Sequence, residues 1–360
     1  MRPGRCPVCD QLVFFDNSTC LSCGVALGYD PTRGAIVALE GGEGSGILRG
    51  VEDGAERRRC ANQLVARCNW LLPADDPDPL CRSCRLTVLR PSDDESDAMV
   101  AFAEAETAKR RLLAQLHSIG LPVADRASDP DRGLAFELLS SRGRPVVTGH
   151  EAGLITLDLS ESDDAHREFV RQQLGEPYRT VLGHLRHEIG HYYWPILVQD
   201  TGETEAFRSL FGDERISYDD AREQHYRDGI DEAWRDTHVS QYATMHPWED
   251  WAETFAHYLH IVDGLETADA FGLVVGDPAH AAGQRAWPAP DPGDRSGDGA
   301  DDLVRRWLGL TLALNAMSRS IGQNDLYPFV LSAPVVAKLD LVHRLVVRCV
   351  AVRSAGSGTL

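Results

Sequence analysis

Apolar side chains recur with a helical period in several long segments of the chain. Residues 99–119 place Phe102 and Leu116 on one side, and Gly120 follows directly as a helix end signal. Later segments carry comparable stripes. We expect helices at residues 99–119, 176–198, 218–227, 231–242, 246–260, 301–317 and 334–352.

Shorter apolar runs between the first two of these helices predict a small sheet. Residues 134–139, 145–148 and 154–159 have the length and composition of strands, and residues 149–153 supply a turn between the last two. Residues 287–299 are rich in Pro, Gly and Asp, which predicts a surface loop. The pattern favours an α+β fold that is mostly helical with a small β-sheet.

The chain is long and acidic, with 360 residues and a formal net charge of −19. The length suits two or three domains, and the negative charge disfavours nucleic acid and acidic membranes as partners. No stretch is long and uncharged enough to span a bilayer. The opening residues hold no apolar signal region, so we expect a cytoplasmic protein whose thiols stay reduced.

The segment His187-Glu188-Ile189-Gly190-His191 carries the clearest chemistry. On a helix, His187 and His191 lie one turn apart on the same face and can hold one metal ion. Glu188 lies beside that face, where it can accept a proton from a water molecule. Gly190 inside a helix indicates that another element passes close by. The alternative is a buried helix with two ordinary core histidines.

A third ligand is expected from the helix at residues 246–260. Glu249 and Glu253 are four residues apart and share one face of this aromatic-rich helix. One of them can bind the metal, and the other can hydrogen-bond a ligating histidine from outside. The alternative is a pair of carboxylates on a solvated face.

These two segments together resemble the gluzincin group of zinc metallopeptidases. Residues 249–255 resemble the E-x-F-A-E-x-F segment of lethal-factor-like zincins, with Trp251 in place of the first Phe. The resemblance implies that Glu249 is the zinc ligand, that Glu253 is its outer partner, and that Tyr242 stabilises the oxyanion. Residues 175–194 and 242–249 are similar to the bacterial putative zinc-binding metallopeptidase family with an N-terminal zinc ribbon.

The resemblance also implies a zincin-like fold with a sheet edge beside the cleft, to which an extended peptide can pair. Residues 154–159 are our candidate for that edge strand, and a purely structural edge is the alternative.

Eight of the nine cysteines precede residue 85 and form two sets of four. Paired C-x-x-C knuckles predict a first zinc site, and a third knuckle with two more loosely spaced cysteines predicts a second. Disulfides are the alternative for the first set, and the second set is the weaker prediction. The expected ligands are Cys6, Cys9, Cys20 and Cys23 in the first site and Cys60, Cys68, Cys81 and Cys84 in the second.

The cysteine-rich region is an unsuitable nucleic-acid binder. Residues 1–90 contain no Lys, and their eleven Arg match eleven acidic residues, while each four-cysteine zinc site adds negative charge. Contact with a protein partner, gating of substrate or simple stabilisation is expected instead.

We therefore expect a zinc ribbon at residues 1–90, a metallopeptidase domain at residues 91–352 and a disordered tail at residues 353–360. The expected function is zinc-dependent hydrolysis of a peptide or protein substrate, with one catalytic and one or two structural Zn²⁺ ions. Two alternatives stay open. One is a protein-binding module whose zincin domain is not proteolytic, and the other is a zinc hydrolase that acts on non-peptide amides.

Overall fold

The computed structural model describes residues 3–42, 46–142, 145–162, 180–228, 232–275 and 299–356. These residues form two compact units. Unit 1 contains the described residues before 163 together with Thr180–Leu185, and unit 2 contains those from Arg186 onward. The fold is α+β, with Cys-rich strands followed by helices and a small sheet, as the sequence predicted. The loop expected at residues 287–299 lies almost entirely outside the described residues.

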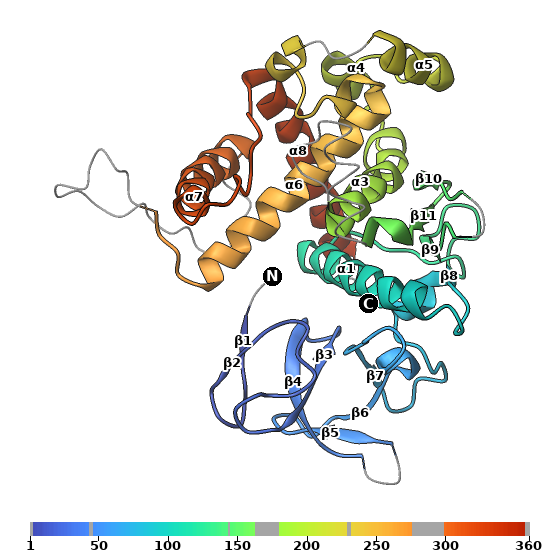
Figure 1. Ribbon diagram of the computed structural model, residues 1–360, viewed down its shortest axis with the longest axis vertical. Coiled ribbons are helices and arrows are strands. Elements are labelled where there is room, and N and C mark those ends of the chain that lie inside the picture. Colours follow the sequence, from blue (N-terminus) through green and yellow to red (C-terminus); the bar gives the residue numbers. More distant parts are fainter. Residues whose placement is uncertain are drawn as a thin grey trace, which may run out of the picture. The chain divides into compact units, whose positions relative to one another are not determined.

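Unit 1 begins with two antiparallel sheets (Figure 1). A short pair, β1 (Gly4–Arg5) and β2 (Leu12–Val13), precedes a five-stranded sheet whose neighbours follow the order of the chain. A hydrogen bond from Tyr29 N to Asn69 O (2.8 Å) brings the first strand of that sheet next to the last. Its strands are β3 (Ala26–Asp30), β4 (Ala35–Gly41), β5 (Leu48–Gly50), β6 (Glu56–Arg59) and β7 (Leu71–Pro73).

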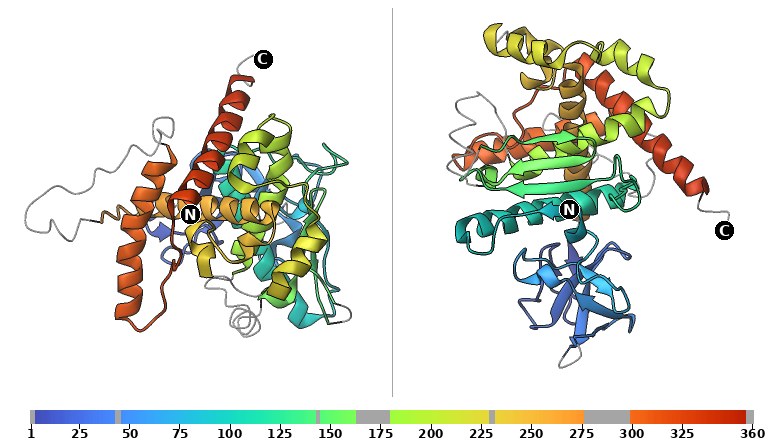
Figure 2. Two further views of the ribbon diagram at one scale, coloured as in Figure 1. Left: turned by 90° about the horizontal axis from the view of Figure 1, so that it is seen from above. Right: turned by 90° about the vertical axis from the view of Figure 1, so that its right-hand side faces the viewer.

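A four-stranded sheet follows in unit 1, with strand order β10-β11-β9-β8. β8 (Thr87–Leu89) and β9 (Ala135–Leu139) are parallel and are joined by helix α1 (Ser96–Ile119), which lies along the sheet in Figure 2, right. β8 precedes the domain boundary that we expected at residue 90, yet it pairs with a strand that lies beyond this boundary.

The expectation that residues 154–159 form an edge strand is wrong. β11 (Leu154–Asp158) lies between β9 on one side and β10 (Gly149–Glu151) on the other. The residues assigned to a turn form β10 themselves, and the reversal is confined to Ala152 and Gly153, both of which have positive φ. The hairpin therefore covers the edge that we had assigned to the substrate, and β10 and β8 are the edges of this sheet.

Helices make up most of unit 2. They are α3 (Val181–Trp194, whose first residues belong to unit 1), α4 (Thr204–Phe211), α5 (Tyr218–Asp228), α6 (Pro247–Ala270), α7 (Ala300–Ser320) and α8 (Ala333–Gly356). Residues 176–179 of the expected metal helix lie outside the described residues. α8 continues through Gly356, so residues 353–356 are helical rather than part of a disordered tail, and residues 357–360 are not described.

The helix expected at residues 231–242 is absent from the described part of that segment. Short 3-10 turns occur instead at Glu232–Asp236 and Tyr242–Thr244. Ser240 Oγ accepts a hydrogen bond from Ala243 N at 3.2 Å, and such side-chain bonds compete with a regular helix.

α3 and α6 approach each other closely at Gly190, and Figure 1 shows the two helices side by side. A Cβ atom on Gly190 would lie 2.8 Å from Ala252 Cα, which accounts for glycine at this position. Trp251 Nε1 donates to Gly190 O at 2.8 Å across the same crossing. Among the described residues, no helix combines the length and apolar character needed to cross a membrane.

Candidate metal centre

Three side chains from α3 and α6 converge on one point. His187 Nε2 lies 2.9 Å from Glu249 Oε2 and 3.3 Å from His191 Nε2, and His191 Nε2 lies 3.5 Å from Glu249 Oε2. Donors about 2.0–2.1 Å from a tetrahedral zinc ion would lie about 3.4 Å from one another. The three groups therefore have the types and spacing of a zinc ligand set.

The position of the proton on His187 also favours the binding of a cation at this point. Glu253 Oε1 lies 2.7 Å from His187 Nδ1, so this nitrogen carries a proton and donates it to the carboxylate. If the ring is neutral, His187 Nε2 then carries a lone pair that faces the carboxylate oxygen Glu249 Oε2. Both atoms are acceptors, so this contact would be repulsive. A proton or a metal ion between them removes this conflict.

Electrostatic shifts follow from the same contacts. Burial lowers the pKa of His187, but the hydrogen bonds and charges of Glu249 and Glu253 outweigh burial and raise it well above its usual value. Burial raises the pKa of Glu253, but its hydrogen bond to His187 outweighs burial and brings the pKa to about 2. Glu249 shifts downward for the same reason. Both acids are therefore anionic near neutral pH.

Glu188 lies on α3 between the two histidines and is buried. Burial raises the pKa of its carboxyl group above the usual value, against the charges of His187 and His191. A carboxyl group with a raised pKa accepts and releases a proton more readily near neutral pH.

Two tyrosines border the site. The ring centroid of Tyr242 lies 5.8 Å from that of His187, so the predicted oxyanion residue is next to the candidate ligands. Tyr218 donates its hydroxyl to Glu249 Oε1 at 2.8 Å. The sequence analysis did not identify Tyr218, because it lies 31 residues before Glu249 and no spacing signal connects the two.

A buried ion pair fixes the start of α6, the helix that carries the candidate ligand Glu249. Asp250 Oδ2 lies 2.6 Å from Lys338 Nζ of α8, and both side chains are buried. Lys338 also donates to Thr237 O at 2.8 Å. These contacts hold the helix that carries Glu249, and sequence reasoning missed them because α8 lies far along the chain.

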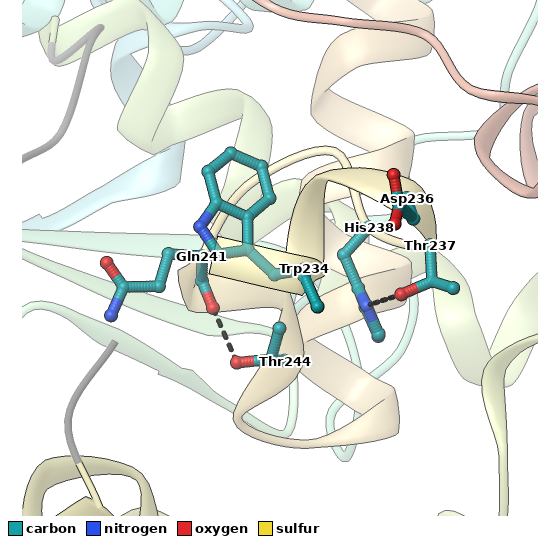
Figure 3. A pocket seen from close by; sticks show the side chains of 7 residues that line it. Trp234, Asp236, Thr237, His238, Gln241 and Thr244 are labelled. Atoms are coloured by element: carbon teal, nitrogen blue, oxygen red, sulfur yellow. Dashed lines mark hydrogen bonds between the residues drawn. The ribbon is translucent and has the colours of Figure 1, made fainter. Parts of the chain in front are cut away.

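A cavity of about 440 Å³ adjoins the segment that leads into Tyr242 (Figure 3). Thr237 Oγ1 and His238 Nδ1 are 2.9 Å apart in its wall, and Thr244 donates to Gln241 O at 2.7 Å. Its lining residues are Ala233, Trp234, Asp236, Thr237, His238, Gln241 and Thr244.

The first cysteine set forms one cluster in unit 1. Cys6 Sγ lies 3.7 Å from Cys23 Sγ, and Cys9 Sγ lies 3.6 Å from Cys20 Sγ. Sulfur atoms bound to a tetrahedral zinc at about 2.3 Å would be about 3.8 Å apart, whereas a disulfide requires about 2.05 Å. The spacing fits zinc and not disulfides.

The second set, Cys60, Cys68, Cys81 and Cys84, is also brought together, and all four thiols are buried. Cys68 Sγ and Cys81 Sγ are 3.6 Å apart, and Cys81 N donates to Cys60 Sγ at 3.3 Å. The looser spacing of Cys60 and Cys68 in the sequence is taken up by the 3-10 turn Ala61–Gln63 and the residues after it.

Helix α1 lies against this second cluster. Glu106 Oε2 lies 3.9 Å from Cys84 Sγ, and Glu106 Oε1 lies 2.6 Å from Lys109 Nζ. Arg110 donates to Arg67 O at 3.2 Å, close to Cys68 in the chain. The side chains of Glu106, Lys109 and Arg110 are buried. The second cysteine cluster therefore contacts helix α1, which follows residue 90, the expected end of the ribbon, in the sequence.

Comparison with known proteins identifies the family. A family described as putative zinc-binding metallo-peptidase matches residues 98–345, and a zinc-ribbon domain matches residues 4–95. The chain therefore belongs to this putative zinc-binding metallo-peptidase family and carries a zinc ribbon, and the predicted resemblance is confirmed. The two family matches and the two four-cysteine clusters support zinc as the metal.

Close relatives occur in mycobacteria. Proteins of Mycobacterium bovis and of Mycobacterium tuberculosis strains CDC 1551 and H37Rv are each 48% identical over 347 residues, which cover 96% of this chain and 95% of the relative. Each of them is named as an uncharacterized protein. No solved structure matches the chain at a significant level.

Proposed function

We propose that the chain is a zinc-dependent peptidase of the gluzincin type. The observation that carries the proposal is the convergence of His187 Nε2, His191 Nε2 and Glu249 Oε2, with buried Glu188 beside them. A purely structural zinc site needs no adjacent carboxyl group with a raised pKa.

His187, His191 and Glu249 would hold the catalytic zinc, and Glu253 would orient His187 from outside. When bound there, zinc supplies Lewis acidity and lowers the pKa of water. The two clusters of four cysteines would hold structural zinc, and the ribbon region at residues 1–90 would then depend on metal for its stability.

The side chains divide the work of amide hydrolysis. Glu188 takes a proton from the attacking water as the carbon–oxygen bond forms. Tyr242 donates its hydroxyl to the oxyanion that develops on the carbonyl oxygen. Glu188 then passes its proton to the leaving nitrogen as the carbon–nitrogen bond breaks, and the carboxylate is restored.

The expected substrate is a peptide or protein. The cavity lined by Gln241 and Thr244 is a candidate place for a substrate side chain, because these two residues flank Tyr242 in the chain. The net charge of −19 supports peptide or protein partners over nucleic acid and acidic membranes. A protein partner could also bind through the zinc ribbon.

A Glu188→Gln variant tests the function. We expect the unaltered chain to hold three zinc ions and to cleave a quenched-fluorescent peptide library, and the variant to hold three zinc ions without cleaving. Glu223→Gln on exposed α5 is the matched control and should cleave normally.

The alternatives predict different results. If the zinc-loaded chain, like Glu188→Gln, cleaves no peptide, the binding-module alternative is favoured. Hydrolysis of simple non-peptide amides without peptide cleavage would favour the second alternative, a zinc hydrolase that acts on non-peptide amides. Equal cleavage by the chain and Glu188→Gln would contradict the proposed mechanism.

A further inference from the structure

Tyr218 reaches the metal centre from outside the two ligand helices. It is the first residue of α5, and its hydroxyl donates to Glu249 Oε1 at 2.8 Å. The other carboxylate oxygen, Glu249 Oε2, faces the Nε2 atoms of His187 and His191 at 2.9 and 3.5 Å. We propose that Tyr218 is a positioning residue that occupies Oε1 and leaves Oε2 as the oxygen of Glu249 available to the metal.

The chemical consequence is a carboxylate that binds through one oxygen. A carboxylate can bind a metal through one or both oxygens, and a catalytic zinc site has three protein ligands and keeps one position for water. A hydrogen bond from a phenol to a carboxylate is a charge-assisted bond and is stronger than a neutral one. Tyr218 therefore opposes two-oxygen binding, which would compete for the position that water needs.

The hydrogen bond between Tyr218 and Glu249 is supported on both sides by one histidine, His246. His246 Nδ1 accepts from Trp248 N at 3.1 Å and so caps the helix that carries Glu249. Because Nδ1 accepts, the proton of the neutral ring is on Nε2, which donates to Ile216 O at 3.3 Å, two residues before Tyr218. His246 is buried, and its ring centroid lies 5.2 Å from that of Tyr218.

A second anchor holds the segment before Tyr218. Arg208 of α4 donates its Nε to Glu214 Oε2 at 2.9 Å, and Glu214 is buried. The phenol is thus held from α4 and from the start of α6, so its direction toward Glu249 does not depend on a bound metal. Such support is what a positioning role requires.

The role of Tyr218 differs from the role proposed for Tyr242. The Tyr218 hydroxyl donates its proton to Glu249. Tyr242 forms a side-chain hydrogen bond with Tyr218, its ring lies beside His187, and its hydroxyl is assigned to the substrate oxyanion. Loss of the Tyr218 hydroxyl should change the metal site itself, and loss of the Tyr242 hydroxyl should change turnover. The inference rests on the proposed zinc ligands and not on peptide cleavage.

The experiment measures zinc affinity in the full chain. A chelator first removes zinc from the site of His187, His191 and Glu249, while the four-cysteine sites stay filled. Zinc is then added back in competition with a chromogenic chelator, which gives the affinity of this site. We expect Tyr218→Phe to lower zinc affinity about 10- to 100-fold, as removal of a hydrogen-bond partner of a ligand typically does. Tyr258→Phe should stay within about two-fold of the unaltered chain, because its hydroxyl is paired with His343 and not with a proposed ligand.

Tyr258→Phe is the matched control, since it removes a buried phenol of α6 whose oxygen lies 3.3 Å from His343 Nδ1. A metal-bound structure of the unaltered chain gives a second readout that needs no variant. It should show Glu249 bound through Oε2 alone, with Oε1 still hydrogen-bonded to Tyr218.

Each outcome has a defined meaning. Unchanged zinc affinity in Tyr218→Phe, or two-oxygen binding by Glu249 in the unaltered chain, would overturn the inference and leave the peptidase proposal standing. Absence of zinc from the site of His187, His191 and Glu249 in the unaltered chain would overturn both. Zinc binding that depends on Tyr218 in a chain that cleaves no peptide would support the inference and refute the function.

Discussion

Glu253 Oε1 lies 2.7 Å from His187 Nδ1, on the opposite side of the imidazole from Glu249. This contact fixes the ring so that Nε2 faces the other two candidate ligands. A carboxylate that accepts from a ligating histidine also makes that histidine a stronger donor to the metal.

Replacement of Glu253 should therefore weaken metal binding without removing a ligand. We expect Glu253→Ala to lower zinc affinity at this site about 10- to 100-fold and Glu253→Gln to lower it less, since an amide oxygen still accepts the hydrogen bond. Zinc titration of the two variants, with Glu223→Gln as the control, checks this. Equal affinity in all three would show that Glu253 does not support His187.

Gly190 is expected to be required for the crossing of α3 and α6. A Cβ atom there would lie 2.8 Å from Ala252 Cα, so Gly190→Ala should force the helices apart and lower the free energy of unfolding by about 1–3 kcal/mol. Gly309→Ala on α7 has open space around the new methyl group and should raise stability by about 1 kcal/mol. Denaturant unfolding of both variants measures the difference. Similar stability of the two variants would contradict the steric argument.

The buried pair on α1 should show strong non-additivity. Lys109→Met leaves buried Glu106, close to Cys84, with only Arg110 Nη1 at 3.7 Å as its cation, and should cost about 3–5 kcal/mol of stability. The double replacement Glu106→Leu with Lys109→Met removes both charges of the pair and leaves Arg110 with its hydrogen bond to Arg67 O, so it should recover part of that loss. Thermal unfolding of the single and double variants tests this. Additive losses would mean that the pair does not act as a unit.

Buried histidines should make unit 2 sensitive to acid. Burial lowers the pKa of His257 to about 4, against the charge of Glu253, and its Nδ1 lies 2.6 Å from Tyr327 Oη. The unfolded chain, in which the pKa is about 6.5, binds more protons between these values, so stability is full above pH 6.5 and falls as pH approaches 4.

His257→Gln should remove this dependence. The loss of unfolding free energy between pH 7 and pH 5 should be smaller by about 2 kcal/mol in the variant than in the unaltered chain. Denaturant melts of both proteins at the two pH values give this number. An identical loss in both would show that His257 is not the responsible group.

The sequence predicted what depends on short spacing and missed what depends on distant chain segments. Helical periodicity and the i, i+4 pairs were enough to bring His187 and His191 to one face of α3, and Glu249 and Glu253 to one face of α6. Tyr218 and Lys338 reach Glu249 and Asp250 through tertiary packing alone, and no local pattern marks them.

Strand order was missed for a related reason. An apolar run does not reveal which strand lies beside it, so residues 154–159 could not be told from an edge strand until the β10 hairpin was seen. The helix expected at residues 231–242 failed because side-chain hydrogen bonds such as that of Ser240 outweigh an apparent helical pattern.

β8 has a consequence for any attempt to study the region after residue 90 alone. This strand comes before residue 90, directly after Cys84, and forms the outer border of the sheet beside β9. A fragment that starts at residue 91 would expose the unpaired backbone of β9, whose Phe136 and Leu138 are strongly apolar and buried. Such a bare strand is prone to pair with strands of other molecules, so the fragment should aggregate even if its candidate zinc ligands are intact.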